Sequence, residues 1–353
     1  SDTIAVDVPD GIVLENEYIK VKVKRDGCFE SIYDKEVGRE VLAAPSNVIE
    51  VHVDKPGSFD AWDVERVTVE IPGVKPDLAE EARIIANGPV FASVKSSYRY
   101  GDSTIEQTIT LYKGSRLIRV DVILDWHEKN RLVKVWFKPD VKTEDAYFEV
   151  PFGVVKRSMI VKDSWDEARF EVPALRWVDV SDGYRGFAII ATDRHGYTVR
   201  EGRIGLSLLK SPLMPNPWSD LGLHKTTYYV YPHIGDYRVG EVYRRAYEVW
   251  SGVKWVVKDN DGGRLPSSYS LLEVPHGVII ECIKLSEEGR GIVIRFYEVE
   301  GGERTVELKL PGCFDIYELN LLEDTIGRIA YNTDTIKLCF KPFEIKTILL
   351  SKT

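Results

Sequence analysis

The sequence predicts an all-β chain made of two domains, at about residues 1–258 and 259–353. Apolar and polar residues alternate with a period of two along most of the chain, as in Ile19–Lys24 (IKVKVK). The alternating segments are short, and turn signals such as Arg25–Gly27 (RDG) separate them. A length of 353 residues gives enough material for two cores.

The first domain is predicted to hold many strands and one short helix. After an opening hairpin, strands are expected at 47–53, 66–71, 91–100, 104–112, 117–125, 132–137, 146–150, 167–171, 186–192, 204–209 and 226–231. A helix is expected at about 239–250, where Val242, Ala246 and Trp250 fall on one face.

The second domain is predicted to be a small β-sandwich. Asp259–Pro266 (DNDGGRLP) is the expected linker, because Gly, Asp and Pro interrupt regular structure. About seven short strands are expected beyond it, which suits a sandwich of immunoglobulin-like size.

Composition limits the kinds of partner. A net charge of −9 and a pI near 5.4 argue against nucleic acid and anionic membranes as ligands. No apolar run approaches the roughly 18 residues of a membrane span. The four cysteines, at 28, 282, 313 and 339, form no CxxC pair, so reduced thiols and a cytoplasmic protein are expected. Because the chain opens at Ser1 directly in strand-like sequence, we expect it to be a piece of a longer protein.

Asp54–Asp63 (DKPGSFDAWD) combines three carboxylates and a Trp in ten residues. Pro56 and Gly57 interrupt the preceding strand, which predicts a loop at a sheet edge. Carboxylates accept hydrogen bonds from hydroxyl groups and an aromatic ring stacks on a pyranose, so the loop could bind sugar. The alternative is a surface turn whose Trp folds back into the core.

Other chemistries lack a full set of residues. His52 and Asp54 are two apart and point to the same face of a strand, but no further ligand completes a zinc site. The chain has no GxSxG elbow and no glycine-rich phosphate loop. An epimerase would need an acid and base pair, and His127, His195 and His233 offer none. We therefore predict no metal ligand and no catalytic residue.

A second polar cluster spans Lys210–His233 (KSPLMPNPWSDLGLHKTTYYVYPH). Pro212, Pro215 and Pro217 favour an extended loop, and Asp220 and His224 lead from the loop into a strand. These two residues could bind a sugar or hold the loop to its neighbour. For His224 the pattern favours the second role, a hydrogen bond between loop and strand.

Several motifs occur in one order along almost the whole chain. They are Val13–Val23 (VLENEYIKVKV), Ser31–Leu42, Asp54–Pro56 (DKP), Phe59–Glu65 (FDAWDVE), Ala146–Arg157, Arg169–Asp182, Ser207–Asp236, Arg295–Gly302, Glu318–Asp324 and Lys341–Leu350. Together they resemble the C-terminal, non-catalytic β region of glycoside hydrolase family 38 α-mannosidases. Phe59 stands where the similar family loop usually has a Trp.

The resemblance implies a galactose-mutarotase-like supersandwich for residues 1–258, followed by the small immunoglobulin-like sandwich. Family members are retaining enzymes that cleave terminal α-mannosyl residues, with zinc and the nucleophile in an N-terminal barrel that a helical domain follows. That barrel would lie upstream of Ser1. The resemblance therefore implies that this chain holds no cofactor, packs on the barrel and helical domains, and is inactive alone.

The resemblance also implies that loops of the large β domain wall the cleft that takes mannose-containing oligosaccharides. The residues expected to face this cleft are Asp60, Trp62, Asp63, Asp220 and His224. Some relatives contact substrate through an Arg just after the Asp of the second loop, and Leu221 occupies that position here. A different class of function remains as the alternative: a free-standing, non-catalytic carbohydrate-binding β-sandwich.

Overall fold

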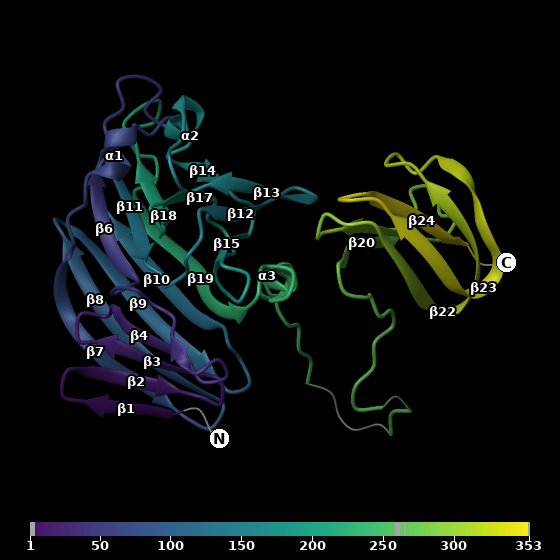
Figure 1. Cartoon of the computed structure of the whole chain (residues 1–353), viewed down its shortest axis with the longest axis horizontal. Coiled ribbons are helices and arrows are strands. Elements are labelled where there is room, and N and C mark those ends of the chain that lie inside the picture. Colours follow the sequence, from purple (N-terminus) through teal and green to yellow (C-terminus); the bar gives the residue numbers. More distant parts are fainter. Residues whose placement is uncertain (1–3, 258–261, 265, 352–353) are drawn as a thin grey trace. The chain divides into compact units, whose positions relative to one another are not determined.

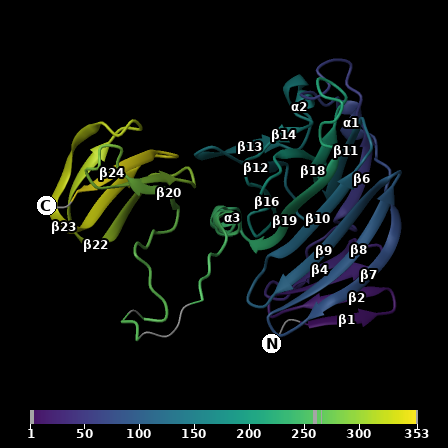
Figure 2. The same cartoon turned by 180° about the vertical axis from the view of Figure 1, so that it is seen from behind.

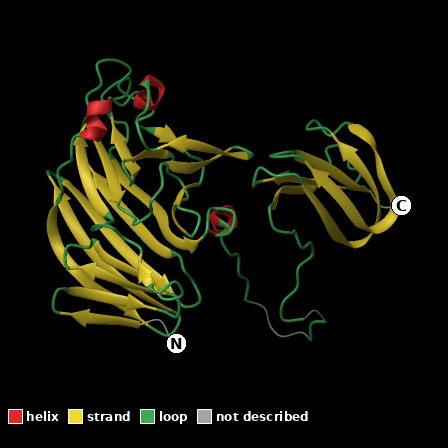
Figure 3. Cartoon of the chain, in the orientation of Figure 1, coloured by secondary structure: helices red, strands yellow, loops and turns green. Residues whose placement is uncertain are grey.

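In the computed structural model, nearly all regular structure is β-strand, which confirms the predicted all-β class (Figure 3). The structure describes residues 4–257, 262–264 and 266–351. The chain divides into two compact units, Ser1–Glu149 with Lys156–Trp250 and Val150–Val155 with Ser251–Thr353. Half of the predicted linker, residues 259–261 and 265, lies outside the described residues.

Unit 1 is organised around a nine-stranded antiparallel sheet of order β13-β12-β15-β16-β19-β10-β9-β8-β7 (Figure 1). Only the end of β12 and the start of β13, within residues 150–155, are grouped with unit 2. Its strands are β7 (Asp77–Asn87), β8 (Phe91–Tyr100), β9 (Ser103–Tyr112), β10 (Ile118–Trp126), β12 (Asp145–Val150), β13 (Gly153–Ser158), β15 (Trp177–Ser181), β16 (Arg185–Ala191) and β19 (Gly222–Ile234). Six of these strands were predicted, whereas β7, β13 and β15 were not. The sequence of β7, DLAEEARIIAN, is rich in charge and in helix-forming residues.

Two five-stranded sheets complete unit 1. One has the order β1-β2-β3-β4-β5, with strands β1 (Ile4–Val8), β2 (Gly11–Glu15), β3 (Ile19–Lys24), β4 (Phe29–Asp34) and β5 (Arg39–Glu40). The other has the order β14-β17-β18-β11-β6, with strands β6 (Val48–Val53), β11 (Arg131–Phe137), β14 (Val172–Pro173), β17 (Gly196–Arg200) and β18 (Arg203–Ser211). The strands of these sheets are seen from behind in Figure 2.

A single hydrophobic core joins the three sheets. Alternate residues of β10 are buried, and the cluster also contains Ile12 and Val21 of the first small sheet and Ile49 of the second. Inside it, the side chain of Asn47 donates to Gln107 Oε1 at 2.9 Å and accepts from the hydroxyl of Tyr228. All three polar side chains are buried, so these hydrogen bonds satisfy groups that would otherwise be costly to remove from water.

The expected strand at 66–71 is wrong, because this segment forms the short helix α1 (Arg66–Glu70). The alternation of Val67, Val69 and Ile71 was misleading, since Val67 and Ile71 are exposed and Val69 alone of the three is buried. The backbone bonds locally, with Ile71 N donating to Val67 O at 3.2 Å.

The expected strand at 167–171 is also wrong, because α2 (Ser164–Ala168) occupies its start. Asp163 caps this helix by accepting a hydrogen bond from Asp166 N at 2.9 Å, a signal that the period-two interpretation overlooked. Beyond α2, Glu171 lies 2.7 Å from the buried ammonium of Lys134 on β11. This ion pair attaches the segment to the sheet.

The predicted helix corresponds to α3 (Val242–Ser251). Val242 and Ala246 are buried as expected, whereas Trp250 is 56% exposed. Its ring lies edge-on to Tyr247 and near the guanidinium of Arg176. Trp250 shares a helix face with Val242 and Ala246 but is not buried with them. No described helix is long and apolar enough to cross a membrane.

In the described residues, unit 2 has five strands in the order β20-β21-β24-β22-β23, rather than about seven short ones. They are β20 (Val278–Leu285), β21 (Ile292–Glu298), β22 (Arg304–Leu319), β23 (Thr325–Phe340) and β24 (Ile345–Ser351). The long pair β22 and β23 contains bulges, so each was read from sequence as shorter strands. The unit has its own core, which includes Phe296, Leu308 and Ile348.

We predict that Tyr228→Phe lowers the free energy of unfolding by about 1–3 kcal/mol, because Asn47 Oδ1 would lose its buried donor. Chemical denaturation at neutral pH measures this change. Tyr229→Phe is the matched control, since the neighbouring Tyr229 is only half-buried, and it should change stability much less. Equal losses in the two variants would contradict a role for the buried network.

Candidate functional site

The two polar loops that the sequence singled out lie side by side at one end of unit 1. We call residues 54–65 and 212–221 the loop pair. Strand β11 pairs with β6 on one edge and with β18 on the other, so Arg131 stands opposite both Val53 and Ser211. The chain leaves the sheet after each of these residues, which brings the loops together near α1 and α2 (Figure 1).

Asp60 connects the two loops directly. Its Oδ2 accepts hydrogen bonds from the backbone N–H groups of Leu213 at 2.6 Å and Met214 at 2.9 Å. Its Oδ1 is buried and has no hydrogen-bond partner among the described residues. Asp60 is therefore a positioning residue that fixes the second loop on the first.

Beneath this contact lies a buried ion pair. Asp54 is fully buried, and its Oδ2 accepts a short hydrogen bond from the ammonium of Lys210. Burial raises the pKa of Asp54, the Lys210 charge opposes this shift, and the carboxylates of Asp60 and Asp63 add to it. The carboxylates of Asp60 and Asp63 thus lie close enough to Asp54 to raise its pKa, with Lys210 as the counter-charge.

The outer surface of the loop pair presents aromatic rings beside a carboxylate. Trp62 is 75% exposed and Trp218 is 71% exposed, so the alternative in which Trp62 folds into the core is excluded. The ammonium of Lys129 lies 4.7 Å from the centre of the Trp218 ring. Asp63 is also exposed, and its Oδ1 accepts from Val64 N at 2.9 Å. Exposed rings next to hydrogen-bonding groups are suited to sugars.

Asp220 and His224 belong to the same loop pair but differ in role. Asp220 is exposed and has a left-handed backbone with φ of 55°. His224 Nε2 lies 3.0 Å from the carbonyl oxygen of Asp220, so the imidazole holds the end of the loop to the start of β19. This is the loop-to-strand hydrogen bond that the sequence favoured for His224.

The region near His52 does not fit a metal. His52 Nε2 lies 3.4 Å from Trp136 Nε1 and 3.5 Å from Glu50, while Asp54 pairs with Lys210 instead. Burial lowers the pKa of His52 to about 4, and the nearby Lys134 charge adds to the shift. Among the residues that the structure describes, no group of three or more His, Cys, Asp or Glu side chains could hold a metal ion.

Three members of the site were not singled out from the sequence. Trp218 lies in the proline-rich loop, two residues before Asp220. An aromatic residue so close to a carboxylate could have marked it as a candidate sugar-binding residue. Lys210 pairs with Asp54 across 156 positions, and Lys129 comes from the turn between β10 and β11. No local pattern marks such long-range partners.

Comparisons with known proteins cover nearly the whole chain. The model of the "Glycosyl hydrolases family 38 C-terminal domain" matches residues 14–218, and that of the "Glycosyl hydrolases family 38 C-terminal beta sandwich domain" matches residues 277–348. The first match includes nearly all of the loop pair.

Individual relatives are much longer than this chain. "Alpha-mannosidase G" of Dictyostelium discoideum is 31% identical over 97% of this chain and 32% of its own length. "Alpha-mannosidase 2C1" of Mus musculus is 29% identical over 96% of this chain and 33% of its own. The crystal structure of an alpha-mannosidase from Enterococcus faecalis V583 has the same fold, with a TM-score of 0.76 and 19% identity over 96% of this chain and 42% of that one. The chain spans about a third of the length of these curated relatives.

We predict that Asp60→Ala loosens the second loop, because the N–H groups of Leu213 and Met214 lose their acceptor. Hydrogen–deuterium exchange should become faster at residues 212–221 and stay unchanged in unit 2. Asp63→Ala serves as the control, since Asp63 bonds only to the adjacent Val64 backbone. Unchanged exchange in the Asp60 variant would show that this carboxylate does not hold the loop.

We also predict that His52 destabilises the fold in acid. Its folded pKa of about 4 lies below its ordinary value of 6.5, so the unfolded chain gains a proton first as the pH falls. Relative to pH 7.5, the loss at pH 5 should be about 2 kcal/mol. Urea unfolding at both pH values should show that stability falls less in acid for His52→Gln than for the unsubstituted chain. An identical acid loss in His52→Gln would contradict the assignment.

Proposed function

This chain belongs to glycosyl hydrolase family 38, and we propose that it is the C-terminal β portion of a retaining, zinc-dependent α-mannosidase. In this proposal the intact enzyme acts on terminal α-mannosyl residues of oligosaccharides. Support comes from the two family matches and from relatives named alpha-mannosidase that are about three times as long. The catalytic barrel and helical domains would occupy the additional length.

The proposed role of this chain is to pack on the barrel and wall its active-site cleft. The supporting observation is the loop pair, where a rigid base of Asp54, Asp60 and Lys210 carries the exposed groups Trp62 and Trp218. Carboxylates and rings fixed in this way could hold the hydroxyl groups and apolar face of a sugar. Binding energy would then assist distortion of the ring that reacts in the barrel.

Large apolar side chains are exposed around the same end of unit 1. They come from the loop pair and from the segments that carry α1 and α2, and comprise Phe59, Trp62, Val67, Ile71, Val74, Ile160, Val161, Trp165, Met214 and Trp218. Exposed apolar clusters of this kind mark surfaces that bind another protein part. We assign this surface to contact with the barrel, except for Trp62 and Trp218, which are proposed to face the cleft.

The proposal leaves zinc chemistry outside this chain. The described residues offer no group of metal ligands, and the nearest candidates, His52 and Asp54, already have other partners. When bound in the barrel, zinc would hold hydroxyl groups of the reacting sugar. The isolated chain is therefore proposed to be inactive. The free state of all four cysteines supports a reducing, cytoplasmic location.

The alternative is a free-standing carbohydrate-binding β-sandwich. The exposed Trp62 and Trp218 rings favour it, because stacking rings can bind a sugar without a catalytic domain. In that case the loop pair of the isolated chain would bind mannosides by itself and would not affect turnover in a longer protein.

We predict that Trp62→Ala in the full-length protein raises KM or lowers kcat by roughly tenfold for an α-mannoside. The reason is the loss of a cleft surface, with the barrel and its zinc left intact. Steady-state kinetics and elemental analysis for zinc measure the two effects. Tyr184→Ala is the control, since Tyr184 is 86% exposed in the turn between β15 and β16.

Three outcomes would contradict the proposal. Unchanged kinetics in Trp62→Ala would remove the loop from the cleft, and loss of zinc would make the loop a metal site. Turnover of p-nitrophenyl α-mannoside by the isolated chain with added zinc would show that catalysis does not require the barrel.

A further inference from the structure

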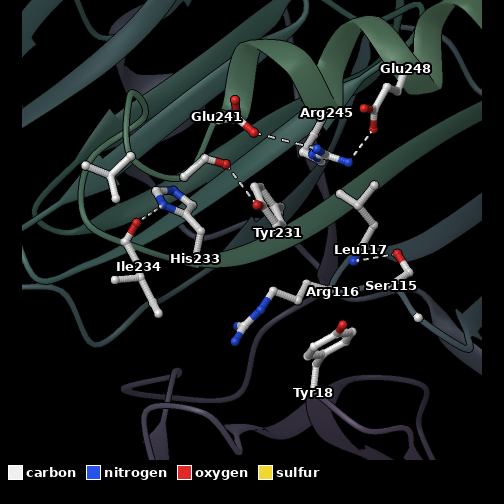
Figure 4. Close-up of a pocket in the computed structure, with 13 residues that line it drawn as sticks. Tyr18, Ser115, Arg116, Leu117, Tyr231, His233, Ile234, Glu241, Arg245 and Glu248 are labelled. Carbon is white, nitrogen blue, oxygen red and sulfur yellow. Dashed lines mark hydrogen bonds and ion pairs between the residues drawn. The ribbon is translucent and has the colours of Figure 1, made fainter. Parts of the chain in front are cut away.

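A pocket of about 440 Å³ lies in unit 1 (Figure 4). Its residues stand near the start of β10 and the end of β19, the opposite ends of these strands from the loop pair. It is bounded by the turn that holds Tyr18, the turn that leads into β10, the end of β19 and the helix α3. Its volume falls within the range of about 300–1,000 Å³ that is usual for small-molecule sites. We propose that this pocket binds a neutral saccharide, at a site separate from the proposed cleft.

The first wall combines an aromatic ring with a fixed guanidinium. The Arg116 carbon Cζ lies 5.4 Å from the centre of the Tyr18 ring. The guanidinium donates to Asp34 at 2.6 and 3.4 Å and pairs also with Glu36. Tyr18 remains 37% exposed, so a sugar could stack beside a donor group that is already oriented.

The opposite wall comes from α3. Arg245 Nη1 lies 2.6 Å from Glu248, and Nη2 lies 3.8 Å from Glu241 (Figure 4). All three side chains line the pocket. Their donors and carboxylate acceptors can recognise hydroxyl groups, each of which both donates and accepts.

The inner wall is rigid. Tyr231 donates to the carbonyl of Gly240 at 2.9 Å, which ties β19 to the segment before α3. His233 Nε2 lies 2.7 Å from Asp179, and both side chains are buried. A Cβ atom at Gly240 would lie only 2.3 Å from His233 Nδ1, so the glycine allows this close packing. A preorganised wall reduces the entropy lost on binding.

The balance of charge selects the class of ligand. Both guanidinium groups are paired with carboxylates, from Asp34 and Glu36 for Arg116 and from Glu241 and Glu248 for Arg245. Glu241 also lies 3.3 Å from Arg244, and the lining itself carries two guanidinium groups and two carboxylates, so its formal charges balance. A cation would meet the two guanidinium groups of the lining. A neutral molecule with many hydroxyl groups can accept hydrogen bonds from the guanidinium groups and donate hydrogen bonds to the carboxylates.

The test is calorimetric titration of the chain, with saturation-transfer NMR, against methyl α-D-mannoside, D-glucose, D-galactose and inorganic phosphate. At least one saccharide should bind in the millimolar range, and Tyr18→Ala should weaken it roughly tenfold. Glu248→Gln should also weaken binding, because it removes a charged acceptor at an exposed position. Tyr33→Ala is the matched control, since Tyr33 is similarly exposed on β4 but does not line the pocket.

The variant Trp62→Ala separates this inference from the proposed function. Binding that survives in Trp62→Ala and is lost in Tyr18→Ala supports the pocket whether or not the loop pair walls a cleft. The inference is overturned if no saccharide binds, if phosphate binds and displaces the saccharide, or if binding depends on Trp62 and is unchanged in Tyr18→Ala.

Discussion

The pairing of β11 with β6 on one edge and β18 on the other is the constraint on which the loop pair depends. It places Val53 and Ser211 opposite the same residue, Arg131, although they are far apart in the chain. Both strands end there, so two polar segments must leave the sheet next to each other. The register of this sheet is in turn fixed by burial of Ile49 and Leu206 in the common core, since a slip of one residue would expose them.

Within the loop pair, some polar residues hold the two loops in place, and others remain exposed and can contact a ligand. Asp54 is committed to Lys210, and Asp60 is committed to two backbone N–H groups of the neighbouring loop. Asp54 is buried and Asp60 is half-buried, and these partners stabilise the two carboxylates, because an unpaired charge removed from water is costly. The groups free to contact a ligand are therefore the exposed ones, chiefly Trp62, Asp63 and Trp218. From the sequence, Asp60 and Asp63 were expected to have the same role, whereas in the structure Asp60 holds the second loop and Asp63 is exposed.

Local patterns were sufficient for the parts of the fold that local physics controls. Alternation of apolar and polar residues predicted β3 and β8 correctly, because each of these two strands has one buried face. The turn before β4 likewise indicated where that strand begins. Alternation wrongly predicted a strand at 66–71, where the chain forms the helix α1. The edge strand β7 was not predicted, because its many charged residues obscure the alternation. The contacts that assemble the site could not be predicted from spacing, since Asp54 and Lys210 are 156 positions apart. His224 was the exception, because its partner lies four residues away on the same loop.

Strand β19 links the two regions that we consider able to bind a ligand. Gly222 at its start adjoins the loop pair, and His233 near its end forms part of the inner wall of the pocket. At a rise of about 3.3 Å per residue, these positions are on the order of 35 Å apart along a paired strand. A ligand in the pocket could therefore not reach the loop pair, and hydrogen bonds to β10 and β16 on both edges of β19 keep the two regions at this separation. Strand pairing in the large sheet thus keeps the proposed cleft surface and the proposed saccharide pocket apart, so each can be tested without the other.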